Sequence, residues 1–175
     1  MLLATIVIAV AACGDDDGDD TAAPEDLCPT VQAWSDSAVD AVDAFRDASR
    51  ELEPDGRRAR YAEAFVDESE LRNEFAEHLA DLDLPPAVAE RLDEALAAVT
   101  QTFEDGATEA AALPDAAYAV RSVREGSLVT SVEKAKAIVY QALNELADDS
   151  ATGISRGCGR RAPLDLSPAA TYPGS

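Results

Sequence analysis

Apolar residues recur every three or four positions from Leu27 to Leu146, and proline-containing breaks divide this pattern into four long segments. A period close to 3.6 residues is typical of an α-helix that buries one face. The regular alternation of apolar and polar residues that marks a half-buried strand is absent. The sequence therefore predicts an all-α protein whose helices bury their apolar stripes against one another.

The breaks set the expected bounds of each helix. Pro54-Asp55-Gly56 ends the first segment, Pro85-Pro86 separates the second from the third, and Leu113-Pro114-Asp115 precedes the fourth. Proline is tolerated in the first turn of a helix but breaks its interior, so each motif marks a boundary. We expect helices over residues 28–53 (or 30–53), 57–83, 86–112 and 114–149.

The fourth expected helix is longer than the others. At 1.5 Å per residue it would measure about 54 Å, against about 40 Å for its neighbours. Gly126-Ser127 is the natural place for a break, and Thr130-Ser131-Val132-Glu133 has the form of a capping box that could restart the helix. The sequence therefore predicts a kinked or interrupted fourth helix.

The apolar run at the start of the chain is about half as long as a bilayer-spanning helix, which needs roughly 20 residues. It ends in Val10-Ala11-Ala12-Cys13, which resembles the lipobox of bacterial lipoproteins. The resemblance implies that residues 1–12 are a signal peptide, that the chain is cut before Cys13, and that the thiol of Cys13 carries a diacylglyceryl group. It also implies a lipid-anchored protein on the extracytoplasmic face of the cell membrane. Because signal peptides begin with Lys or Arg and Met1-Leu2-Leu3 has neither, we expect a basic segment encoded upstream.

Residues 13–27 follow as an acidic tether without apolar periodicity. Their aspartates do not fit a calcium-binding loop, because counting from Asp15 places Asp20 where the loop needs glycine and Asp26 where it needs glutamate. The whole chain has a formal net charge of -21, which disfavours nucleic acid and anionic lipid surfaces as partners. Membrane association is therefore expected through the lipid anchor.

Three cysteines occur in the chain, and lipidation of Cys13 leaves Cys28 and Cys158 as a pair. Outside the reducing cytosol such a pair forms a disulfide; a zinc site is the alternative, but two thiols and one distant histidine make a poor ligand set. A Cys28–Cys158 bond requires the first helix to begin where the last one ends. This requirement favours an up-down-up-down four-helix bundle over residues 28–158 rather than five antiparallel elements. Residues 159–175 are expected to be a flexible tail.

Candidate chemistry is sparse. Ser131-Val132-Glu133-Lys134 matches the S-x-x-K motif of penicillin-binding proteins and class A β-lactamases, but the companion triplets are missing. His78 is the only histidine, and no E-x-x-H motif of a di-iron bundle is present. Arg156, Arg160 and Arg161 flank Cys158, where their positive charges can offset the partial negative charge at the C-terminal end of a helix. We therefore expect no catalytic residues, no metal and no cofactor.

Three function classes remain after this search. The first is a non-catalytic lipoprotein that binds an envelope protein through one face of the bundle; over residues 28–158 the chain is similar to small helical lipoproteins of high-GC bacteria. The alternative is a small-ligand carrier, with an apolar cavity near the irregular residues 124–130 and Glu68. Trp34, Phe45 and Phe75 would line that cavity. An enzyme ranks third, since nothing supplies a nucleophile with an oriented base.

Overall fold

The computed structural model describes residues 25–149, 152 and 154. The expected signal peptide, Cys13, most of the tether, Cys158, the three arginines beside it and the tail lie outside the described residues. The described part of the chain is all helical and contains no strand, which confirms the predicted fold class. Its elements are α1 (Leu27–Ser49), α2 (Pro54–Ala80), α3 (Pro86–Ala111), the 3-10 helix η1 (Asp115–Ala119) and α4 (Arg121–Asp148).

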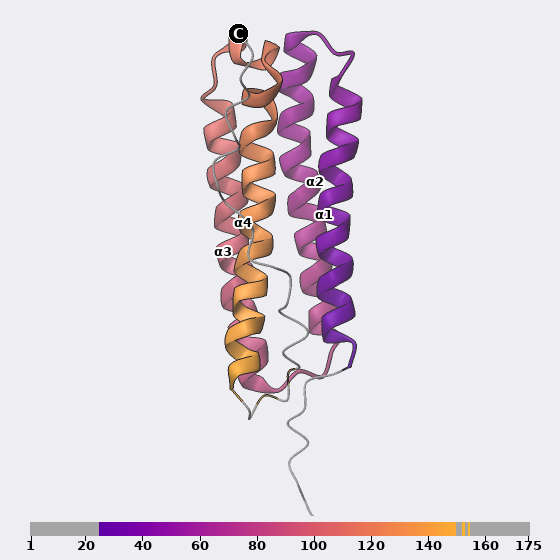
Figure 1. Ribbon diagram of the computed structural model, residues 1–175, viewed down its shortest axis with the longest axis vertical. Coiled ribbons are helices and arrows are strands. Elements are labelled where there is room, and N and C mark those ends of the chain that lie inside the picture. The colour runs from indigo at the N-terminus through magenta and orange to yellow at the C-terminus, as the bar shows by residue number, and fades with distance from the viewer. Residues whose placement is uncertain (1–24, 150–151, 153, 155–175) are drawn as a thin grey trace, which may run out of the picture.

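The four long helices run up, down, up and down along one axis (Figure 1). α1 packs mainly on α2, and α3 packs mainly on α4, so the bundle consists of two closely packed pairs placed side by side. The beginning of α1 and the end of α4 lie at the same pole (Figure 1). The end of α1, the beginning of α2, and η1 lie at the opposite pole.

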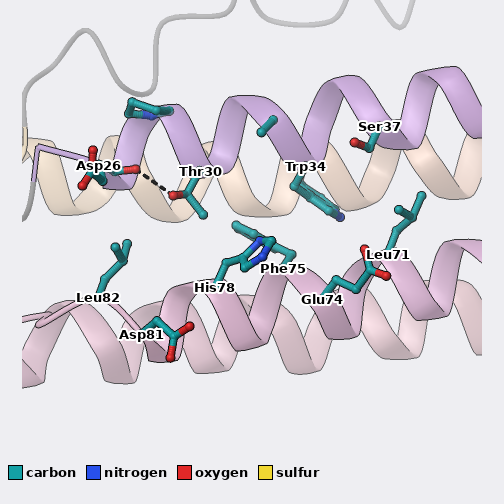
Figure 2. Close-up of a pocket in the computed structure, with 12 residues that line it drawn as sticks. Asp26, Thr30, Trp34, Ser37, Leu71, Glu74, Phe75, His78, Asp81 and Leu82 are labelled. Carbon is teal, nitrogen blue, oxygen red and sulfur yellow. Dashed lines mark hydrogen bonds between the residues drawn. The ribbon is translucent and has the colours of Figure 1, made fainter.

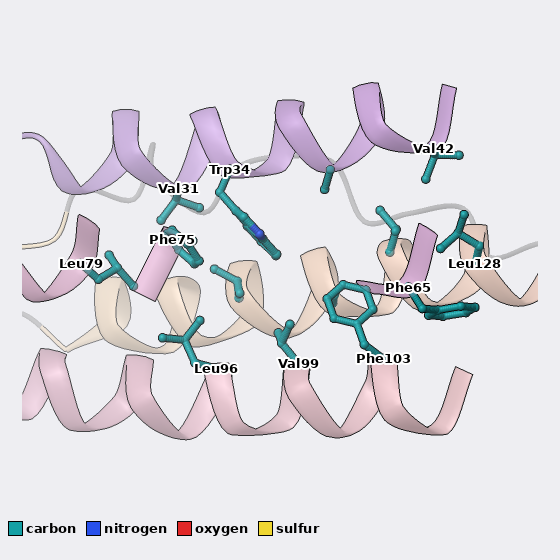
Figure 3. Close-up of a cluster of buried hydrophobic side chains, with 14 of the residues drawn as sticks. Val31, Trp34, Val42, Phe65, Phe75, Leu79, Leu96, Val99, Phe103 and Leu128 are labelled. Carbon is teal, nitrogen blue, oxygen red and sulfur yellow. The ribbon is translucent and has the colours of Figure 1, made fainter. Parts of the chain in front are cut away.

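The apolar stripes meet along the bundle axis and form one continuous core (Figure 3). The helical spacing predicted most of its members, including Val31 and Trp34 in α1, Phe75 and Leu79 in α2, and Leu96 in α3. Most predicted stripe residues are buried, whereas Val120 is 49% exposed. Tertiary burial of these stripes, rather than helix propensity alone, holds such helices together in water.

The boundaries between α1 and α2 differ from the expected ones, and α2 also ends at Ala80 rather than residue 83. α1 ends at Ser49 rather than residue 53, where the Ser49 hydroxyl donates a hydrogen bond to the Arg46 carbonyl. α2 begins at Pro54 rather than residue 57, because proline fits the first turn of a helix, where its missing N–H would have had no acceptor. The Pro54-Asp55-Gly56 motif therefore starts a helix as well as ending one.

The predicted break at Gly126-Ser127 is wrong. α4 is continuous from Arg121 to Asp148, and the chain leaves helical geometry earlier, at the extended Val120 between η1 and α4. The reason is Tyr118, which is buried and whose hydroxyl donates to the Ala110 carbonyl at 2.8 Å. Residues 115–119 form η1, which places this ring in the core, so they are not part of α4.

The predicted capping box is wrong for the same reason. Thr130 lies in the interior of α4 rather than at a helix start. Glu133, its expected partner, pairs instead with Lys136 at 3.1 Å.

None of the described helices combines the length and the apolar character needed to cross a bilayer.

Candidate functional site

A groove of about 510 Å³ lies between α1 and α2 and ends at the pole where α1 begins. We call it the α1–α2 groove; it is drawn in Figure 2. Its floor is aromatic: the Trp34 and Phe75 rings stack with their centroids 4.8 Å apart and their planes 10° from parallel. Its lining residues are Asp26, Pro29, Thr30, Ala33, Trp34, Ser37, Leu71, Glu74, Phe75, His78, Asp81 and Leu82.

The rim of the α1–α2 groove is acidic. Asp26, Glu74 and Asp81 are exposed, and no lysine or arginine of the described residues lines the groove. Trp34 at its floor is only 5% exposed, and its indole N–H is buried without a hydrogen-bond acceptor among the described residues. The groove therefore combines a negatively charged rim with an apolar floor.

A second groove, of about 500 Å³, lies between α2 and α3 and reaches η1. We call it the α2–α3 groove. Phe65, Phe103 and Tyr118 contribute apolar surface to its lining, and Val66 is exposed there by 56% of its surface. This groove is more apolar than the first, and its charged lining residues are one cation, Arg58, and one anion, Glu104.

Glu68 is the most unusual buried group in the described part of the chain. It lies on α2, is 1% exposed, and neither of its carboxyl oxygens has a hydrogen-bond partner. Burial, and after it the nearby charge of Asp67, together raise the pKa of Glu68 to about 8. A carboxyl group in this environment is protonated at neutral pH, because ionisation there is costly.

A cluster of tyrosines joins α2, η1 and α4 near the opposite pole. The ring of Tyr61 makes edge contacts with Phe45, Phe65 and Tyr118. Its hydroxyl accepts a hydrogen bond of 2.9 Å from the Leu128 backbone N–H. The contact joins α2 to α4 just after Gly126, where α4 remains continuous.

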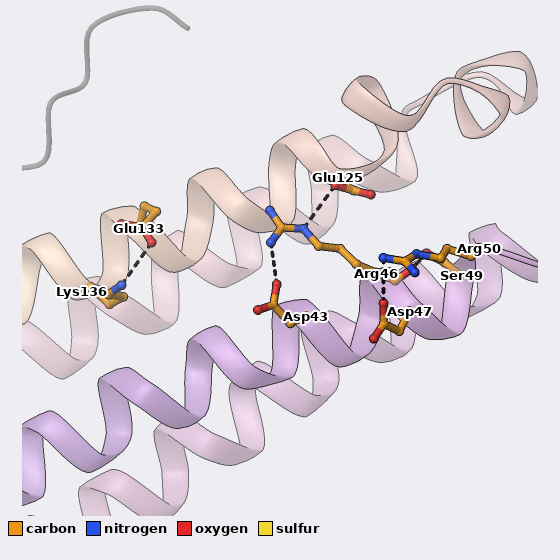
Figure 4. A network of polar contacts seen from close by, with 8 residues as sticks. All are labelled: Asp43, Arg46, Asp47, Ser49, Arg50, Glu125, Glu133 and Lys136. Atoms are coloured by element: carbon orange, nitrogen blue, oxygen red, sulfur yellow. Dashed lines mark hydrogen bonds and ion pairs between the residues drawn. The ribbon is translucent and has the colours of Figure 1, made fainter.

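Polar contacts connect α1 to α4 across the loosest side of the bundle (Figure 4). The Arg46 guanidinium bridges Asp43 on its own helix at 2.6 Å and Glu125 of α4 at 3.2 Å. Glu125 is buried, so this contact is shielded from water on one side. These groups have structural roles and do not converge on either groove.

Of the residues proposed for the carrier cavity, only Trp34 and Phe75 come together. Trp34 and Phe75 line the open α1–α2 groove, whereas Phe45 is fully buried against Tyr61. Glu68 lines neither of the two grooves. Within residues 124–130, where the cavity was expected, Leu128 is buried and its backbone N–H donates to the Tyr61 hydroxyl.

The remaining candidates separate in the same way. Ser131 is buried, and the position where Gly106 would carry a Cβ lies against its hydroxyl. Lys134 is exposed, so Ser131 and Lys134 do not share a site. His78 is exposed at the edge of the α1–α2 groove. Among residues 25–149, 152 and 154, no three His, Cys, Asp or Glu side chains are placed to hold a metal ion.

A family model described as "Domain of unknown function (DUF8586)" matches residues 7–156. The chain belongs to this family. No curated protein matches the chain, and neither does any solved structure. The DUF8586 match takes in all four helices and both grooves, together with Cys13 and Cys28.

Proposed function

We propose that this DUF8586 protein is an exported lipoprotein, anchored by lipid on Cys13, whose bundle is a non-catalytic interaction module for another envelope protein. The observation that carries the proposal is the lipobox-like Val10-Ala11-Ala12-Cys13 followed, after an acidic stretch, by a helix that begins at Leu27. The intervening chain spans at most about 50 Å when extended, at roughly 3.5 Å per residue. The bundle is therefore held close to the membrane surface.

The arrangement of the poles supports the same proposal. The helix that follows the tether in sequence, α1, begins at the pole where α4 ends (Figure 1). Cys28 lies in the first turn of α1, half-buried, and its side chain is not free. A Cys28–Cys158 disulfide is thus compatible with the helix directions. It would close both ends of the domain at the membrane-facing pole.

The decisive experiment compares two cysteine variants in a host that processes lipoproteins. In wild type we expect the mature chain to begin at a diacylated Cys13 and to sediment with membranes. Cys13→Ser is expected to remain unprocessed and to lose the lipid, whereas Cys28→Ser keeps both. An unmodified Cys13 in the mature wild-type protein would contradict the anchor.

The protein partner is tested by crosslinking in the intact envelope, which should repeatedly capture the same protein. Recovery of random neighbours alone contradicts an interaction module.

A small-ligand carrier is the second candidate function. The α2–α3 groove supports it, since about 500 Å³ is within the usual volume range of small-molecule sites and its lining is largely apolar. Native mass spectrometry of the purified protein tests this candidate. A copurifying apolar compound that is lost in a Val66→Glu variant would favour the carrier over the interaction module.

A further inference from the structure

We infer that the α1–α2 groove is the docking site of the chain's own arginine-rich segment, residues 156–166 (RGCGRRAPLDL). The segment lies outside the described residues, so the inference is carried by the chemistry of the groove, by the segment's sequence and by the place where the described chain stops. It goes beyond the proposed function and does not require the lipid anchor.

Charge complementarity is the first argument. The rim carries Asp26, Glu74 and Asp81, and residues 25–45 and 73–90 contain no lysine or arginine. Residues 156–166 hold three of the chain's 14 lysines and arginines, at positions 156, 160 and 161. Guanidinium groups pair well with carboxylates, and here they would neutralise an acidic pole of a strongly acidic protein.

The apolar floor of the groove also matches the sequence of the segment. Trp34 and Phe75 form this floor with stacked rings. Pro163, Leu164 and Leu166 supply apolar side chains that can cover it. The segment therefore offers apolar groups for the floor as well as cations for the rim.

The end of the described chain is the third argument. Thr152 donates from its hydroxyl to the Leu146 carbonyl, and Ile154 is buried in the core. These contacts hold the chain at the end of α4, the pole at which the groove also ends. The six Cα–Cα steps from Ile154 to Arg160 can extend about 20 Å, about twice the usual 8–10 Å between packed helix axes. The segment can therefore pass beneath the bundle and reach the groove.

A site-specific photo-crosslinker in place of Ala33, an exposed residue of the groove, tests the docking in the full-length protein. We expect it to capture residues 156–166 of the same chain. The same probe at Ala62, in the α2–α3 groove, is expected to capture them far less. Arg160→Glu with Arg161→Glu should lower the capture about fivefold, as expected for the loss of two exposed ion pairs. Arg160→Lys with Arg161→Lys should retain most of it.

The groove side provides an independent check. Glu74→Lys with Asp81→Lys should lower the capture to a similar degree, whereas Glu77→Lys, exposed on α2 but outside the groove, should leave it unchanged. Equal capture by the two probe positions, capture of a second chain or of residues 14–24, no capture, or yields unaffected by charge reversal would each overturn the docking. Lipid on Cys13 is read separately from the mass of the N-terminal peptide, so failure of the anchor and failure of the docking are distinguishable.

Discussion

At the scale of single residues, Glu68 sets the pH dependence that the fold should show. Its pKa is raised from an ordinary value of 4.5 to about 8, first by burial and then by the charge of Asp67. Between these pH values the folded protein keeps a proton that the unfolded chain releases. The free energy of unfolding therefore falls as pH rises through this window and levels off above about pH 8. The stabilising contribution is fully present only below about pH 4.5.

Glu68→Gln is predicted to flatten this dependence. The amide stays neutral at every pH, so above pH 7 the variant should be more stable than wild type, by roughly 2–4 kcal/mol. Urea unfolding followed by circular dichroism from pH 5 to pH 9 measures the effect. Glu70→Gln, an exposed neighbour on α2, is the control and should keep the wild-type slope. Parallel curves for wild type and Glu68→Gln would show that Glu68 is ionised in the folded protein.

Tyr61→Phe is predicted to destabilise the bundle by about 1–2 kcal/mol, since the buried hydrogen bond between the Leu128 N–H and the Tyr61 hydroxyl is lost. The aromatic contacts of the ring are kept, so the effect isolates the hydroxyl group. Tyr140→Phe is the matched control, because that hydroxyl is only half-buried and lies 3.4 Å from Gln32. Chemical denaturation at fixed pH measures both variants. Equal small losses would contradict a special role for the Tyr61 hydroxyl.

Sequence periodicity found most of the core but not its exceptions. Trp34 and Phe75 were predictable because their spacing places them on apolar stripes. Glu68 could be seen to interrupt the stripe of α2, yet only the packed helices show that it is sealed from water. Tyr118 carried no periodic signal, because its burial depends on a 3-10 turn that packs against α2 and α4.

At the scale of helices, the two interior glycines of α3 and α4 have opposite surroundings. A Cβ on Gly106 would contact the Ser131 hydroxyl and come within 2.8 Å of the Phe65 ring, whereas nothing lies within 4 Å of a Cβ on Gly126. Gly106 therefore allows α3 to approach α4 and α2 closely. Gly126 is an ordinary helical residue with an open side.

Alanine substitutions at these glycines are predicted to act in opposite directions. Gly106→Ala should lower the free energy of unfolding by about 1–3 kcal/mol through overpacking. Gly126→Ala should raise it by about 0.5–1 kcal/mol, because alanine is the better residue in a continuous helix. Thermal unfolding of the two variants beside wild type provides the comparison. Destabilisation by Gly126→Ala would mean that the helix is broken there after all.

Helix number and approximate bounds followed from proline and apolar spacing, but the position of the break did not. Glycine is a weak helix breaker, and length alone could not choose between Gly126 and the residues before Arg121. The deciding contact, Tyr118 with the Ala110 carbonyl, joins η1 to the end of α3. The apolar spacing within a single helix cannot predict this contact, because it joins two elements.

For the molecule as a whole, helix directions were predictable, whereas the grooves were not. Four segments with short connections favour antiparallel neighbours, and the structure has that arrangement. The α1–α2 groove depends on how far apart two helices lie and on which of their rims is acidic. Only the assembled bundle fixes both, although each contributing residue could be read from the sequence.

The proposed Cys28–Cys158 disulfide yields the prediction that belongs to this scale. Closing a loop that contains the entire bundle should stabilise it by about 4–5 kcal/mol in the chain-entropy model. The free energy of unfolding in guanidinium should therefore be larger for oxidised wild type than for Cys158→Ser by this amount. Reductant should lower the free energy of unfolding of wild type to that of the variant and leave the variant unchanged. Cys28→Ser and the double variant should match Cys158→Ser, because removing either sulfur opens the same loop. Two free thiols in the oxidised, folded wild-type protein would contradict the bond and leave the helix packing alone to hold the two ends at one pole.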